Sequence, residues 1–199
     1  APDARISSSG AARAVLAALD SLRLERAHQV GVGQGGNVAV EMIARRAQMA
    51  RSLSLLSATG VEEFELLGNV DINRPLYAAQ LAILWLVDRF VPHFGALDDA
   101  KLDLDYARYL HQSDPRPARG VLESLDVPTL IVHGREDFLV PPEIAREHAR
   151  IVPQAELEIV EGVGHDLLHH RADRVREGLG RFLERVETGT ALARTEAPP

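Results

Sequence analysis

Apolar residues recur along this chain at two spacings that alternate from one segment to the next. Some segments carry an apolar residue every three or four positions, which is typical of a helix with one buried face. Between them lie short, nearly continuous apolar runs, which are typical of strands buried on both faces. The predicted helices are residues 8–22, 34–48, 141–152 and 172–186, and the predicted strands are residues 27–32, 51–57, 127–134 and 155–162. Strands separated by helices predict an α/β fold, with a parallel sheet flanked by helices.

One long segment interrupts this alternation. Residues 61–118 have helical spacing and several aromatic side chains, and prolines break them repeatedly. We therefore predict a mostly helical insertion there rather than one more strand–helix unit. Residues 1–60 and 119–187 would form the two parts of the α/β core. The final residues, 188–199, lack any periodicity and are predicted to be a disordered tail.

Composition excludes several classes of function. The chain has 199 residues, 46% of them hydrophobic, and a net charge of −7, so we expect one sizeable core and no nucleic-acid surface. It has no cysteine, which excludes disulfides and thiolate sites. No signal peptide or stop-transfer segment is visible, and the most apolar window, residues 76–87, is too short to span a bilayer. We expect a cytoplasmic protein.

Three loops that follow predicted strands contain candidate chemistry. The sequence "GVGQGG" follows residues 27–32, "GREDFLVPP" contains Asp137, and "GVGHDLLHH" contains His165. The carboxyl ends of parallel strands open on one edge of the sheet, where ligands bind. We therefore expect these loops to lie close together. His133, at the end of its strand, is expected to be structural or to line a pocket.

Two other interpretations of these motifs were weighed. Gly31, Gly33 and Gly36 match the dinucleotide-binding pattern G-x-G-x-x-G, but no acidic residue ends the next predicted strand. His165 and His169 are spaced to share a helix face, as metal ligands do, but no carboxylate is clearly placed to complete a site. We expect no metal and no other cofactor.

On the three loop motifs, the chain resembles the C-terminal two thirds of an α/β-hydrolase of the esterase, lipase or epoxide-hydrolase type. The resemblance implies that Asp137 is the acid and His165 the base of a catalytic triad. It also implies that Gly33 stands at the nucleophile position and that the Gln34 N–H helps to hold the oxyanion. Residues 61–118 would then be the lid. Val32 and Trp85 are the expected pocket residues, although apolar lid residues can equally serve packing alone.

The chain departs from the family pattern at the nucleophile. Glycine stands at position 33, no shift of the motif produces a serine, and Ser57 ends a different strand. We therefore expect impaired ester-type hydrolysis, with a retained pocket for a small apolar ester or acid. One alternative is an active hydrolase in which His165 activates a water molecule. Another is a hydrolase domain of a larger, possibly membrane-tethered protein.

A second departure concerns the sheet. The family places several strands before the elbow, and these are not recognisable in this sequence. Residues 27–32 would therefore form a bare sheet edge, which is prone to pair with other chains. We expect an upstream segment or a partner chain to cover this edge, unless the sheet has been rebuilt.

Overall fold

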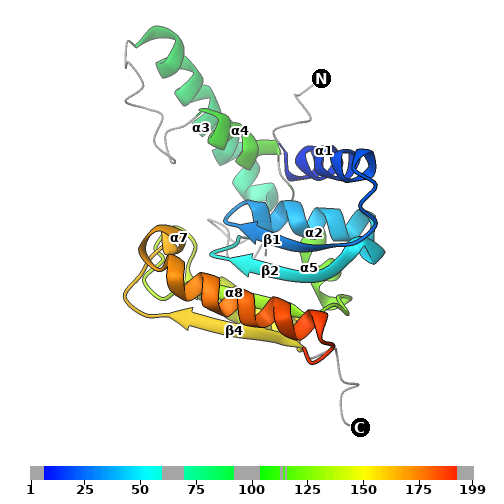
Figure 1. Cartoon of the computed structure of the whole chain (residues 1–199). Helices are drawn as coiled ribbons and strands as arrows, with labels where there is room; N and C mark the ends of the chain where they lie inside the picture. The colour runs from blue at the N-terminus through cyan, green and yellow to red at the C-terminus, as the bar shows by residue number, and fades with distance from the viewer. Residues whose placement is uncertain (1–6, 60–69, 92–103, 113, 115, 192–199) are drawn as a thin grey trace.

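A four-stranded parallel sheet forms the centre of the molecule. The computed structural model describes residues 7–59, 70–91, 104–112, 114 and 116–191. The strands follow the order of the sequence across the sheet, as β1 (Ala27–Val32), β2 (Ala50–Leu56), β3 (Thr129–Gly134) and β4 (Ala155–Val160). Each pairs with the next in parallel, so their carboxyl ends lie at one edge of the sheet (Figure 1). The predicted α/β fold with a parallel sheet is confirmed.

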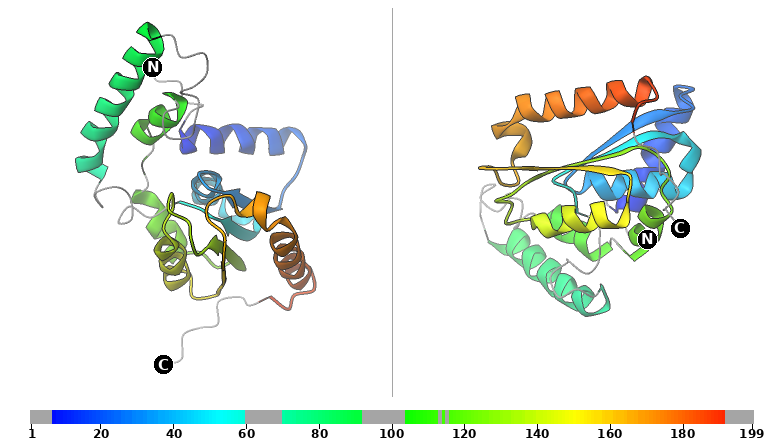
Figure 2. Two further views of the ribbon diagram at one scale, coloured as in Figure 1. Left: turned by 90° about the vertical axis from the view of Figure 1, so that its left-hand side faces the viewer. Right: turned by 90° about the horizontal axis from the view of Figure 1, so that it is seen from below.

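Helices cover both faces of the sheet (Figure 2). One face carries α2 (Gly35–Arg45), α5 (Arg116–Glu123) and α6 (Pro142–Ile151), and α1 (Ser8–Ser21) packs on α2. The other face carries α8 (Ala172–Glu187), preceded by the short helix α7 (Leu167–His170). The remaining described helices are α3 (Val70–Phe90) and α4 (Leu104–Gln112), which pack on each other.

The two middle strands explain the continuous apolar runs in the sequence. On β2, Leu53 and Leu55 pack toward α2 and α5, while Leu56 packs toward α8. On β3, Val132 likewise faces α8, where the ring of Phe182 is almost completely buried. Both faces are therefore removed from water, and each fully buried side chain of this size contributes about 1.5–3 kcal/mol.

Some predicted boundaries differ from the structure. The helix predicted over residues 34–48 ends at Arg45, and a 3₁₀ helix (Ala47–Met49) leads into β2. Helix α5 runs through residue 118, where the sequence placed the end of the insertion. Much of the predicted insertion (60–69 and 92–103) and most of the predicted tail (192–199) lie outside the described residues.

Helix α3 is long and apolar but largely unburied. It lies to one side of the sheet, and Ile83, Trp85 and Phe90 on it are at least half exposed (Figures 1 and 2). Its proposed role as part of a lid stays a prediction. Within the described ranges, no helix combines the length and hydropathy needed to cross a membrane.

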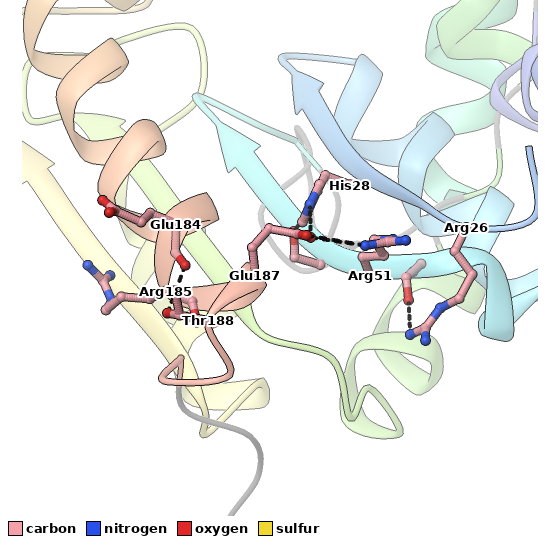
Figure 3. A network of polar contacts seen from close by, with 9 residues as sticks. Arg26, His28, Arg51, Glu184, Arg185, Glu187 and Thr188 are labelled. Atoms are coloured by element: carbon pink, nitrogen blue, oxygen red, sulfur yellow. Dashed lines mark hydrogen bonds and ion pairs between the residues drawn. The ribbon is translucent and has the colours of Figure 1, made fainter.

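Strand β1 is one edge of the described sheet. Val30 and Val32 on it are each 44% exposed, whereas Gln29 and Gly31, which alternate with them, are buried. A polar cluster stabilises the opposite end of the strand (Figure 3). There, His28 lies 2.9 Å from the Ser52 hydroxyl of β2 and 2.9 Å from the Glu187 carboxylate of α8. That a further segment or partner covers this edge stays a prediction.

Glycine brings two functional loops into direct contact. A Cβ on Gly134, the last residue of β3, would lie 2.4 Å from the carbonyl oxygens of Val163 and Gly164. Backbone cannot yield as a flexible side chain can, so only glycine allows the loop after β3 to touch the loop after β4. Their contact positions Asp137 relative to His165.

We predict that Gly134→Ala lowers the free energy of unfolding by about 2 kcal/mol or more, because the added methyl group must push two backbones apart. The matched control is Gly180→Ala on α8, where nothing lies within 4 Å of the new Cβ. That change should stabilise the protein by about 0.5–1 kcal/mol through helix propensity. Urea unfolding measures both, and equal effects of the two substitutions would contradict the prediction.

Candidate active site

A sharp turn joins β1 to α2 at Gly33. Its φ is +52°, in the left-handed region that glycine enters without strain. The Gly33 N–H donates to the Leu56 carbonyl at 3.0 Å, and the Gly33 carbonyl accepts from the N–H groups of Gly36 and Thr59 at 3.1 and 3.3 Å. The predicted elbow is therefore present as a backbone structure. Gln34 follows at the N-cap of α2, where the helix carries a partial positive charge.

The carboxylate of Asp137 is completely buried at the loop that follows β3. Its Oδ1 accepts hydrogen bonds from the N–H groups of Leu139 and Val140, at 3.0 and 2.9 Å. Its Oδ2 lies 2.9 Å from Nδ1 of His165. A buried charge is tolerated only when its lone pairs are satisfied in this way.

His165 connects the acid to the elbow. Because a carboxylate can only accept, the hydrogen bond to Asp137 places a proton on Nδ1 and leaves Nε2 for other partners. A Cβ built on Gly33 would lie 3.6 Å from that Nε2. The structure thus brings Asp137, His165 and Gly33 together, as the sequence predicted, while their catalytic roles stay predictions.

The electrostatics of the pair favour an ionised acid and a basic imidazole. Burial acts to raise the pKa of Asp137, but hydrogen bonds from His133, His165 and the Val140 N–H outweigh it and hold that pKa far below its usual range. The hydrogen bond to Asp137 raises the pKa of His165 above its ordinary value of 6.5, against a smaller opposing effect of burial. His165 therefore becomes a free base only on the alkaline side of that value.

His133, which the sequence predicted to be structural or to line a pocket, contacts the acid of this site. This side chain is almost completely buried, and its Nε2 donates to the Val140 carbonyl at 2.8 Å. The same Nε2–H lies 3.3 Å from Oδ2 of Asp137, so it adds a further positive dipole beside the carboxylate. The available signal was its position four residues before Asp137, at the end of the same strand.

A small hollow of about 130 Å³ adjoins His165. Its walls come from the ends of β1 and β2 and from the loop and helix after β4, and the lining residues are Val32, Leu56, Ser57, His165, Asp166, Leu167, Leu168 and His169. Val32 lines this hollow, and its role as a ligand contact stays a prediction. Trp85 is not among these residues and packs edge-on against Phe90, so its role as a ligand contact stays a prediction.

Ser57 also lines this hollow, although no motif in the sequence placed it near the elbow. Ser57 follows a different strand from the elbow, but parallel strands bring their carboxyl ends together.

A larger hollow of about 740 Å³ lies near Asp20 and Arg46, and neither Asp137 nor His165 lines it. We therefore place the chemistry in the smaller hollow.

We predict that an NMR titration of the His165 ring gives a pKa above 6.5 and that Asp137→Asn lowers it, because the neutral amide stabilises the imidazolium less. The sign for stability follows: a raised folded-state pKa contributes stability below pH 6.5, and this is lost as the pH rises through the folded-state value. An unchanged pKa in Asp137→Asn would contradict the coupling.

The comparisons with known proteins agree with this geometry. The sequence profile described as the Alpha/beta hydrolase family matches residues 1–177. A 2-hydroxymuconate semialdehyde hydrolase from Pseudomonas sp. (strain CF600) is 26% identical over 187 residues, which cover 85% of this chain and 66% of that relative. An acetyltransferase component of the acetoin cleaving system of Pseudomonas putida is 27% identical, over 86% of this chain and 49% of its own length. The chain thus spans two thirds or less of these relatives.

Solved structures show the same fold. A thermophilic esterase from Thermogutta terrifontis superposes with a TM-score of 0.68 at 18% identity, over 90% of this chain and 73% of the esterase. An esterase from Exiguobacterium antarcticum gives a TM-score of 0.69 at 18% identity, over 90% of this chain and 74% of its own. From its profile match, its sheet and its three loops, this chain belongs to the alpha/beta hydrolase family.

Proposed function

We propose that this chain is an impaired ester-type hydrolase. His165 is its general base, and Asp137 orients the imidazole ring and stabilises its protonated form. The observation that carries the proposal is the position of His165: Nδ1 is held by a buried carboxylate while Nε2 faces the elbow at Gly33. Acyl transfer needs this arrangement, because the base must receive a proton at one nitrogen while a carboxylate stabilises the cation from the other.

The substrate we propose is a small apolar ester, with its acid product as a second ligand. The hollow beside His165 is only about 130 Å³, and most of its wall is apolar, including Val32, Leu167 and Leu168. Two similar solved proteins are described as esterases. The printed names of relatives do not agree on one substrate, so the substrate class here rests on the size and polarity of the hollow.

Slow turnover follows from the residue at the elbow. Gly33 has no side chain, so the attacking oxygen must come from a bound water molecule or from another residue. In either case His165 can still take up a proton and the Gln34 N–H can still donate to the oxyanion. Position 33 itself cannot supply the nucleophile, because glycine has no side chain. We therefore propose that the chain retains ligand binding and hydrolyses its substrate at a reduced rate.

We predict that the chain hydrolyses p-nitrophenyl acetate above background and that His165→Ala lowers this rate at least tenfold, since general-base catalysis contributes roughly 10²–10⁴-fold. The rate should rise with pH through the raised pKa of His165, above 6.5. His170→Ala is the matched control, because this exposed histidine lies on α7 but does not line the hollow. Equal rates for all three proteins, at background, would contradict catalysis.

We predict that Gly33→Ser raises the rate at least tenfold and produces a burst of p-nitrophenol, because the new side chain begins 3.6 Å from Nε2 of His165. A side chain at this φ should also cost about 1–3 kcal/mol of stability. Gly33→Ala carries the same strain without a hydroxyl and should show the lower stability but no burst. A burst-free Gly33→Ser protein that remains folded would contradict the proposed alignment of base and elbow.

A further inference from the structure

Ser57 has a backbone conformation that L-residues rarely adopt. Its φ is +44°, and among the described residues only Arg23 is another non-glycine residue with positive φ. Such a conformation is strained and persists only where the surroundings enforce it, often at functional sites. Here the Ser57 N–H donates to the Val132 carbonyl at 2.9 Å, which holds the turn against β3.

The sheet places Ser57 beside the elbow. Val32 of β1 pairs with Leu56 of β2, so Gly33 and Ser57 are the next residue on each of two neighbouring strands. Neighbouring strands lie about 4.8 Å apart. His165 Nε2 is close to the space over Gly33, and Ser57 shares the wall of one hollow with His165. The Ser57 hydroxyl therefore lies at the end of the strand next to the one that leads to Gly33, which stands at the family's nucleophile position.

The Ser57 hydroxyl has no hydrogen-bond partner within the described part of the chain, although the residue is only 1% exposed. Leaving a buried hydroxyl unpaired is unfavourable, and a bound ligand that pairs with it would remove that cost. Because no hydrogen bond holds Oγ, rotation about χ1 toward the hollow breaks none. By contrast, the Ser52 hydroxyl, toward the other end of β2, lies 2.9 Å from His28 and belongs to a hydrogen-bonded cluster.

We propose that Ser57 is the nucleophile of this site. The inference rests on the hydrolase function proposed above, and it identifies the source of the attacking oxygen. Ser57 Oγ–H gives its proton to Nε2 of His165 while Oγ bonds to the ester carbonyl carbon. The ester C–O bond breaks, and the leaving alkoxide takes the proton back from Nε2. A water molecule then gives a proton to Nε2 and bonds to the acyl carbon. The bond between that carbon and Oγ breaks, Oγ takes the proton back from Nε2, and the acid is released.

The test is covalent labelling with diisopropyl fluorophosphate, located by mass spectrometry of the digested protein. Attack by Oγ displaces fluoride, so a reactive serine gains one diisopropylphosphoryl group. We expect one adduct, on Ser57, formed at least tenfold more slowly in His165→Ala. Ser57→Gly should abolish it without unfolding the protein, because glycine accepts the positive φ.

Ser54→Ala is the matched control. Ser54 lies on the same strand, is fully buried and also lacks a hydrogen-bond partner in the described residues, but it does not line the hollow. This variant should keep both the Ser57 adduct and the ester hydrolysis. Loss of labelling in Ser54→Ala to the same extent as in Ser57→Gly would overturn the inference, since the effect would then be structural.

The remaining outcomes separate this inference from the proposed function. Hydrolysis that depends on His165 but is unchanged in Ser57→Gly would mean that water attacks directly, which overturns the inference and leaves the function in place. An adduct on another residue, or none on Ser57, would also overturn it. An adduct on Ser57 without any ester turnover would support the nucleophile and contradict the hydrolase function.

Discussion

The buried carboxylate of Asp137 is the constraint on which the rest of the site depends. A charge removed from water must be satisfied by donors, and here they come from three parts of the chain: the backbone of its own loop, His133 at the end of β3, and His165 after β4. Moving any one of them would leave part of the charge unpaired, which is far costlier than losing a surface contact. The acid therefore fixes the position of the base. The close contact of Gly134 with the loop after β4 supports the same geometry from the backbone.

Glycine at position 33 fits the backbone of the elbow. Gly33 keeps the backbone hydrogen bonds of the turn and adopts its positive φ without strain. The residue with a side chain in the strained conformation is instead Ser57, at the end of the neighbouring strand. The parallel register of β1 and β2 brings Gly33 and Ser57 close to the imidazole of His165.

The sheet edge and α3 differ in character from this compact site. Val30 and Val32 are apolar and partly exposed on β1, and α3 exposes much of its apolar surface. The chain spans only part of the length of its relatives, and this structure does not show what contacts these apolar surfaces. The base and acid do not depend on them, because both are held by β3, β4 and the loops that follow.

Local pattern alone determined the strands and most of the helices, and it marked the two loops that hold Asp137 and His165. Apolar runs in β2 and β3 are visible in the sequence because both faces of these strands are buried, and a strand followed by a glycine-rich turn predicts an elbow wherever it occurs. The ends of elements were less predictable, as where α2 gives way to a 3₁₀ helix before β2, because tertiary packing decides where a helix stops. Only the tertiary structure revealed that His133 supports Asp137 and that Ser57 shares a hollow with His165. The one local signal for the first is the four-residue spacing of His133 and Asp137, and the second has no local signal. The proximity of Ser57 and His165 arises from the pairing of strands distant in sequence, which sets side chains beside one another that the linear order keeps apart.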